Sequence, residues 1–114
     1  PDGLDYVWNL LVIRDANQTT ENLSALRRQI DNIDEQILEL LAKRMRISRE
    51  IGIYKKEHNM PILQSPRYSE ILENRSNMGA QMDLSTDFVK EMLKEIHEES
   101  VRQQMIIMNE EENK

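Results

Sequence analysis

Cysteine is absent from this chain of 114 residues, which also has only three glycines, three prolines and three tyrosines. Without cysteine the chain cannot form disulfide bonds or thiolate metal sites, and this composition fits a reducing compartment, so we expect a cytoplasmic protein. No apolar run approaches the roughly 18 residues that a membrane span needs, so we expect no membrane-embedded segment. The chain begins at Pro1, without an initiator methionine or a signal-peptide pattern, which suggests a processed chain or a piece of a longer one.

An excess of basic side chains is also missing. The chain has 21 acidic and 15 basic residues, a formal net charge of −6 and a pI near 5.0. Non-specific binding to nucleic acids or to anionic membranes would favour the opposite balance, so we expect neither partner. The two histidines, His58 and His97, lack metal-ligand spacing, so we expect them at helix ends or facing solvent, and we expect no metal site.

The pattern of apolar residues predicts an all-α fold with a long, a short and a medium helix, because no alternating strand pattern is present. The long helix should begin at a cap at Thr20 or Asn22 and end before Met60-Pro61. The short helix should run from Ser65-Pro66, with serine as N-cap, to Gly79. The medium helix should begin near Ser85 or Thr86.

Three regions are expected along the chain. Residues 1–22 form an N-terminal segment and linker, which either packs on the main body as a helix or strand or is the remnant of a preceding domain. Residues 23–108 form the helical domain, and residues 109–114 form a frayed, acidic tail.

The long helix needs a partner. A helix of about 36 residues is about 54 Å long, whereas a compact domain of this size has a radius of gyration of about 13 Å. One protomer therefore cannot bury the apolar seam of this helix, which predicts a homodimer. The seam consists of Leu23, Leu26, Ile30, Ile33, Ile37, Leu40, Ile47, Ile51 and Tyr54.

A cation interrupts this seam, since Arg44 takes a place where the spacing calls for leucine or isoleucine. Lys55 lies eleven residues further on and only about 20° around the helix, with Ser48 between them on the same side. Two such cations could hold a small dianion between them. The alternative for Arg44 is an ion pair with a glutamate of a neighbouring helix.

Further polar residues break the pattern elsewhere. Arg67 lies in the first turn of the short helix, where the helix dipole disfavours a cation unless an anion is near. On the medium helix Ser100 and Gln104 replace apolar residues one turn apart, for which ordinary hydrogen bonding between helices is the alternative explanation. Arg27 lies about 25 Å from Arg44 along the long helix, so it could reach such a ligand only in a partner's site.

Together these features resemble the all-helical chorismate mutases. The similarity covers about residues 23–105, in the order and spacing of that family. Its motifs are LSALRRQIDNIDEQILELLAKR (23–44), IGIYK (51–55), Pro61, the helix start at Arg67, Gly79 and ESVRQQ (99–104).

The resemblance implies a three-helix protomer interlocked with a second copy, and the conversion of chorismate to prephenate in phenylalanine and tyrosine biosynthesis, without a cofactor. It implies that Arg27 of the partner subunit, Arg44, Arg67 and Ser100 hold the substrate carboxylates. Lys55 and Gln104 would face the ether oxygen, where negative charge develops in the transition state.

One departure concerns the substrate hydroxyl. Many members of the family carry a glutamate directly after the Arg67 position and an aspartate three residues before it, and here these places hold Tyr68 and Gln64. We expect Tyr68 or a backbone group to take over this contact.

The segment from Leu10 to Arg14 and its polar linker resemble the end of a 3-deoxy-7-phosphoheptulonate synthase, which some members carry fused ahead of the mutase. Two other functions stay open at this point. An isochorismate pyruvate lyase would use nearly the same cationic pocket, and a non-catalytic helical dimerisation or regulatory module would use the seam breaks to fix its register.

Overall fold

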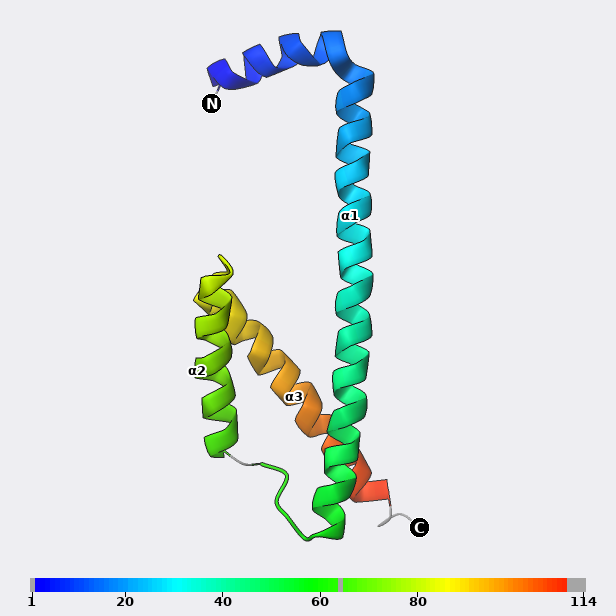
Figure 1. The fold of residues 1–114 in the computed structure, drawn as a ribbon, viewed down its shortest axis with the longest axis vertical. Helices are drawn as coiled ribbons and strands as arrows, with labels where there is room; N and C mark the ends of the chain where they lie inside the picture. The colour runs from blue at the N-terminus through cyan, green and yellow to red at the C-terminus, as the bar shows by residue number, and fades with distance from the viewer. Residues whose placement is uncertain (1, 64, 111–114) are drawn as a thin grey trace. The chain divides into compact units, whose positions relative to one another are not determined.

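The structure, a computed structural model, describes residues 2–63 and 65–110, and the side chains of residues 19–63 and 66–110. These residues form three helices, α1 (Asp2–Glu57), α2 (Ser65–Gln81) and α3 (Thr86–Glu110), and no strand (Figure 1). The predicted all-α class, with a long, a short and a medium helix, is confirmed.

The first helix begins much earlier than predicted. α1 starts at Asp2, so the cap predicted at Thr20 or Asn22 is wrong. The physical reason is that residues 4–51 contain neither glycine nor proline, and a polar side chain at a cap position does not by itself interrupt a helix. The boundary after residue 22 stays a prediction about a preceding domain. Of the predicted tail, residues 111–114 lie outside the described residues.

Both α1 and α2 end in the same hydrogen-bonded cap, with one residue in the left-handed conformation. After α1, Asn59 has φ 53°, and the amide of Met60 donates to the carbonyl of Lys55 at 2.8 Å. After α2, Asp83 has φ 62°, and the amide of Leu84 donates to the carbonyl of Gly79 at 2.9 Å. These caps satisfy carbonyls that would otherwise lack partners. The predicted end of α1 before Met60-Pro61 is confirmed.

Gly79 does not end α2 as predicted but lies inside it, at the contact with α3. A Cβ atom at Gly79 would lie only 2.7 Å from Cγ2 of Val89. The glycine therefore permits a close approach of the two helices. The predicted start of α3 is confirmed, because the Ser85 hydroxyl accepts a hydrogen bond from the amide of Phe88 at 3.4 Å.

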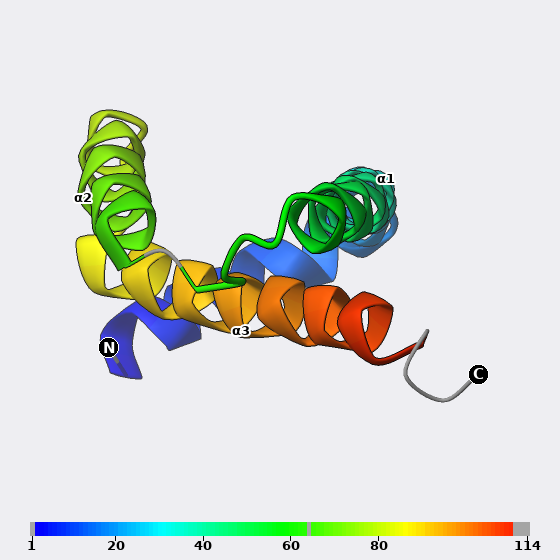
Figure 2. The same ribbon diagram turned by 90° about the horizontal axis from the view of Figure 1, so that it is seen from below.

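The chain divides into two units, residues 1–40 and residues 41–114. In the described part of the first unit, residues 2–40 all belong to α1, and the seam residues from Leu23 to Leu40 are 45–66% exposed. In the second, α3 packs against α2 with its first half and against the end of α1 with its second half (Figures 1 and 2). Its buried side chains are mostly polar; they are Ser48, Lys55, Ser76, Val89, Leu93, Ser100 and Gln104.

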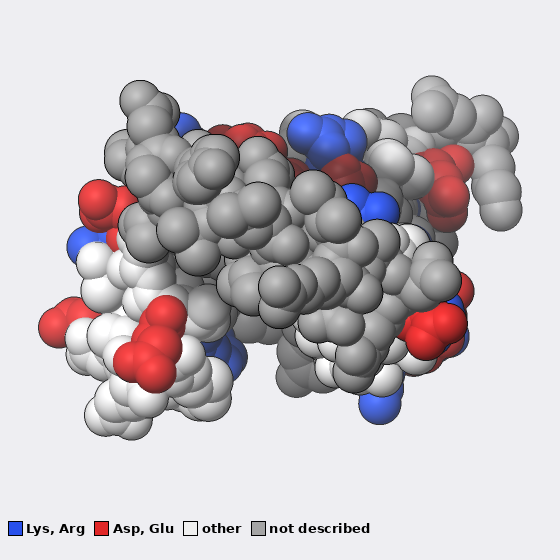
Figure 3. Space-filling view, turned by 90° about the horizontal axis from the view of Figure 1, so that it is seen from above, with Lys and Arg blue, Asp and Glu red and all other residues white. Residues whose placement is uncertain are grey.

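The surface carries charges of both signs. On the face drawn in Figure 3, acidic and basic side chains are interspersed over the described atoms. Among the described residues no helix is long and apolar enough to cross a membrane.

Candidate active site

The polar side chains of the second unit surround a pocket of about 450 Å³ between the end of α1, the loop after it, α2 and α3. Its apolar lining consists of Ile47, Ile51, Ile62, Ile71 and Val101. Its polar lining consists of Arg44, Ser48, Lys55, Arg67, Tyr68, Arg75, His97, Ser100 and Gln104. Side chains that interrupted apolar patterns in the sequence therefore meet in one place.

Arg44 is held from α3. Its Nη1 donates to the Ser100 hydroxyl at 2.6 Å, and the Ser48 hydroxyl donates to the same oxygen at 3.1 Å. Within the described residues no carboxylate forms an ion pair with Arg44, so the alternative of a glutamate partner is not realised within this part of one chain. Burial and the charge of Arg75 lower the pKa of Arg44. Because a guanidinium has five N–H donors, most of its hydrogen-bonding capacity remains for a ligand.

Lys55 and Gln104 form a second hydrogen-bonded pair. Nζ of Lys55 donates to Oε1 of Gln104 at 3.1 Å and to the carbonyl of Ile62 at 2.6 Å, and burial lowers the pKa of Lys55. An ammonium has three donors and no acceptor, so it requires the oxygen of the amide to face it. The Nε2 group of Gln104 and the third proton of Lys55 are therefore left to donate elsewhere.

Gly52 determines how closely α1 and α3 approach each other near Lys55 and Gln104. It is buried, and a Cβ atom there would lie 3.2 Å from Cα of Gln104 and 3.3 Å from its Cγ. Glycine is an unfavourable residue inside a helix, so its position three residues before Lys55 is explained by this close approach. The approach brings Gln104 within reach of the Lys55 ammonium.

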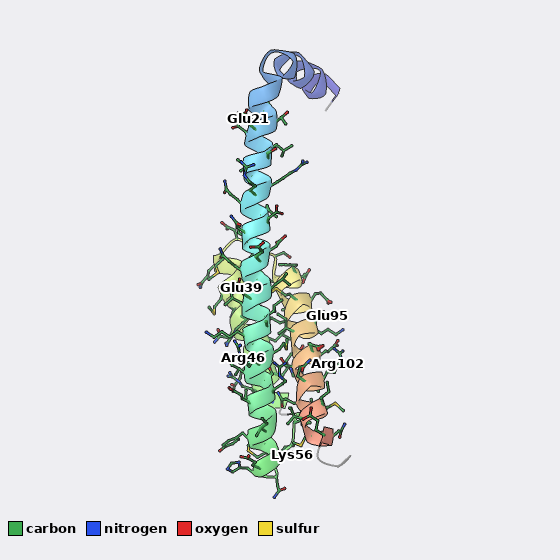
Figure 4. The ribbon with its side chains drawn as sticks, turned by 90° about the vertical axis from the view of Figure 1, so that its right-hand side faces the viewer. Glu21, Glu39, Arg46, Lys56, Glu95 and Arg102 are labelled. Atoms are coloured by element: carbon green, nitrogen blue, oxygen red, sulfur yellow. The ribbon has the colours of Figure 1, made fainter. Side chains whose placement is uncertain are left out.

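Two further cations, Arg67 and Arg75, line the pocket from α2. No residue in the described lining is an aspartate or a glutamate, so the charged side chains of the pocket all have the same sign. Arg67 and Arg75 are themselves exposed, whereas other exposed cations, such as Arg46 on α1 and Arg102 on α3, do not line the pocket (Figure 4). A pocket of this kind favours a small ligand with more than one negative charge.

Tyr68 and His97 stack on each other in the lining, with ring centroids 3.9 Å apart and an angle of 24° between the ring planes. Burial and the charges of Arg44 and Lys55 lower the pKa of His97, against the opposite influence of Glu98. The prediction that His97 lies at a helix end or faces solvent is wrong, because α3 continues for three turns beyond it and its half-buried ring stacks on Tyr68 of α2. His58 follows the end of α1 and is exposed, as predicted.

Most of the site residues predicted from the sequence lie in the lining of one pocket. Arg44, Lys55, Arg67, Tyr68, Ser100 and Gln104 all line the pocket. Arg27 belongs to the first unit, where its side chain is exposed, so its action in a partner's site stays a prediction. Gln64 lies outside the described residues.

Two titratable residues of the pocket, Arg75 and His97, were not predicted as site residues. Arg75 interrupts the apolar stripe of α2 in the same way that Arg44 interrupts the seam of α1, four residues after Ile71. His97 lies four residues after buried Leu93 and three before Ser100, which places it on the inner face of α3. Periodicity alone could have found both residues.

The family model described as chorismate mutase type II matches residues 26–105. A bifunctional chorismate mutase/prephenate dehydratase of Buchnera aphidicola is 35% identical over 88 residues, which are 77% of this chain and 23% of that protein. A protein named T-protein, of Enterobacter agglomerans, is 33% identical over 78 residues, 68% of this chain and 21% of that protein.

A third relative is shorter. The 4-amino-4-deoxychorismate mutase of Streptomyces pristinaespiralis is 29% identical over 83 residues, 73% of this chain and 64% of that protein. The chain thus spans less than a quarter of the first two relatives and about two thirds of this one.

Proposed function

The chain belongs to the chorismate mutase type II family, and we propose that it catalyses the rearrangement of chorismate to prephenate. The observation that carries this proposal is the pocket of four cations and several neutral donors without a carboxylate. Chorismate is a dianion, and its rearrangement is intramolecular, so the reaction needs no nucleophile on the protein. The pocket must fold the substrate into a reactive conformer and stabilise the charge that develops in the transition state.

The arginines of the pocket would bind the two carboxylates of chorismate. Arg44 is fixed by Ser100, and a guanidinium can clasp a carboxylate through two parallel hydrogen bonds. Arg67, on the other side of the pocket, would hold the second carboxylate. Fixing both ends of a flexible molecule lowers the entropy that must be lost on the way to the transition state.

Lys55 and Gln104 would donate hydrogen bonds to the ether oxygen of chorismate. As its bond to the ring breaks, this oxygen gains negative charge, and donors already oriented toward it stabilise the transition state more than the ground state. The hydrogen bond between Lys55 and Gln104 leaves N–H groups on both side chains for this purpose. Because Gln104 is neutral, it donates at any pH.

A homodimer is part of the proposal. The apolar seam of α1 is exposed in the first unit, and the same seam of a second copy could bury it. An antiparallel arrangement would bring Arg27 of one subunit to the pocket of the other. The expected mass in solution is twice the 13.5 kDa of the chain.

The proposal also includes a synthase domain fused ahead of the mutase and a cytoplasmic location. The relatives named for two activities combine the mutase with prephenate dehydratase, so a preceding 3-deoxy-7-phosphoheptulonate synthase rests on residues 10–14 and the linker alone. We expect the enzyme to act in the cytoplasm, as its lack of cysteine suggests.

The direct test is to add chorismate to the purified chain and to follow its loss and the appearance of prephenate. We expect turnover far above the uncatalysed rate. A folded dimer without turnover would favour the helical dimerisation module instead. Conversion of isochorismate to salicylate and pyruvate, without chorismate rearrangement, would select the lyase.

A second test addresses the shared site. The variants Arg27→Ala and Arg44→Ala should each be inactive alone. Mixing them should restore part of the activity, because one of the two pockets in a heterodimer then has both arginines. Failure of the mixture despite proven subunit exchange would contradict the role of Arg27 in the partner's site.

A further inference from the structure

Arg75 is the one cation of the described pocket lining that has no role in the proposed reaction. It follows Arg67 by eight residues, which is about 12 Å along the axis of α2. Among the side chains that the structure describes, Arg75 makes no hydrogen bond and no ion pair. Arg49, by contrast, donates to Gln103 on the neighbouring helix. No contact within one chain therefore explains why a cation occupies this place.

The pocket has two ends, which differ in their residues. α2 runs in the opposite direction to the end of α1, and a loop joins the two helices (Figure 1). Lys55 and Arg67 lie in the helical turns next to this loop, one on each side of it. Along the helix axes, Arg44 lies about 16 Å from Lys55, and Arg75 about 12 Å from Arg67, in both cases away from the loop. Arg44 and Arg75 therefore belong to the same end of the pocket.

The two arginines at this end repel each other. Burial and the charge of Arg75 lower the pKa of Arg44, and an anion placed between two cations offsets their repulsion. The described lining contains no aspartate or glutamate, so within one chain only a ligand can supply that anion. A carboxylate has two oxygens and about four lone-pair sites, so it can accept hydrogen bonds from two guanidinium groups at once.

Resting on the proposed function, we propose that Arg75 binds the same carboxylate of chorismate as Arg44, from the opposite wall of the pocket. Arg67 is then left for the other carboxylate, nearer to Lys55 and Gln104. In this arrangement Arg75 contacts the substrate, but not the oxygen at which charge develops. An interaction that is equally strong in the ground state and in the transition state improves binding without accelerating the chemical step. Arg75 should therefore affect KM, whereas Lys55 should affect kcat.

The first test measures the kinetics of chorismate conversion. We expect Arg75→Gln to raise KM by about tenfold, the scale of one charge-assisted hydrogen bond, and to leave kcat nearly unchanged. Arg75→Lys keeps the charge but lacks the planar fork, so its KM should lie between the two. Arg46→Gln is the matched control, because it changes the net charge equally at an exposed residue that does not line the pocket. It should leave KM unchanged.

The second test asks whether both arginines bind one carboxylate, and it needs no turnover. Prephenate, the product of the proposed reaction, is also a dianion, and NMR titration would give its Kd for the wild-type chain, Arg44→Gln, Arg75→Gln and the double variant. Two groups that bind the same carboxylate depend on each other. The double variant should therefore differ by about threefold or more from the product of the two single effects.

Several results would overturn the inference. Arg75 is exposed in the chain, so its replacement should leave the fold intact, which circular dichroism would check. An unchanged KM in folded Arg75→Gln would exclude a contact with the substrate. A KM that returns to the wild-type value at high protein concentration would assign Arg75 to a contact between two copies instead. Independent effects of the two arginines on the Kd of prephenate would exclude a common carboxylate. Absence of chorismate turnover in the wild-type chain is a different result, since it refutes the proposed function itself.

Discussion

At the scale of single residues, the site depends on cations that are held by neutral partners. Arg44 is fixed by a serine hydroxyl, and Lys55 by a carboxamide and a main-chain carbonyl. An acidic partner would neutralise these charges and compete with an anionic substrate. A neutral acceptor fixes the position of the cation and leaves its charge to the ligand.

Lys55→Ala tests this arrangement. We expect it to reduce kcat/KM by at least about a hundredfold, the usual cost of removing one fixed donor at a developing charge. Lys56→Ala is the matched control, because Lys56 donates to the carbonyls of Ile107 and Met108 rather than into the pocket. It should retain activity and lose about 1 kcal/mol of stability. Similar kinetic losses in both variants would contradict the role of Lys55.

His97 offers a test by pH. Its pKa in the folded chain lies below the ordinary 6.5. Between these values the unfolded chain binds more protons, so the free energy of unfolding should fall as the pH decreases through this window. NMR titration of the imidazole protons should show a midpoint below 6.5 in the wild-type chain, and a higher midpoint in Arg44→Gln, which lacks one of the nearby cations. A wild-type midpoint above 6.5 would show that the ring is not held neutral.

Arg44, Ser100 and Gln104 could be predicted from the sequence because each of them interrupts a periodic apolar pattern, and Arg67 because it is a cation in the first turn of a helix. The periodic pattern does not predict which residues these side chains contact. That Ser100 accepts from Arg44, and that His97 stacks on Tyr68, depends on which faces of α1, α2 and α3 meet. Those contacts join residues that are far apart in the chain, and periodicity within one helix contains no information about them.

At the scale of helices, glycine determines where the axes approach. Gly52 allows α1 to approach Gln104, and Gly79 allows α2 to approach Val89. In the sequence, Gly52 lies inside the predicted long helix, where glycine is a weak helix former, and Gly79 is the predicted end of the short helix. Their close packing with another helix could not be predicted, because glycine also occurs at helix ends for conformational reasons. The extension of α1 to Asp2 was not predicted either, because polar side chains that can cap a helix also occur within helices.

Gly79→Ala distinguishes the two explanations for Gly79. At an open position inside a helix, alanine in place of glycine stabilises by up to about 1 kcal/mol. Here the new Cβ would meet Val89 at 2.7 Å, so we expect a loss of about 1–3 kcal/mol in urea unfolding. Val89→Ala should be destabilising alone, but the double variant should lose less than the sum of both changes. A stabilised Gly79→Ala variant would show that the helices can move apart at no cost.

At the scale of the whole molecule, the proposed dimer interface would both bury the apolar seam of α1 and complete the pocket. The second unit contains the pocket residues of one chain, while Arg27 belongs to the first unit together with the exposed apolar seam. If the seam pairs with a second copy, the same contact that buries it also supplies the last arginine. Activity should then depend on the concentration of chains, since dissociation removes Arg27 from every pocket.

Ile33→Asp tests this link, because Ile33 is 48% exposed in the chain and lies within the seam. We expect the variant to have half the mass of the wild-type protein in sedimentation equilibrium, and to lose activity that returns partly at high concentration. A buried aspartate without a partner is costly, so the interface should weaken by several kcal/mol. Glu35→Ala is the control, since two residues correspond to about 200° around the helix, away from the seam. A monomeric Ile33→Asp chain with full activity would mean that each pocket is complete within one subunit, and that Arg27 has no part in the reaction.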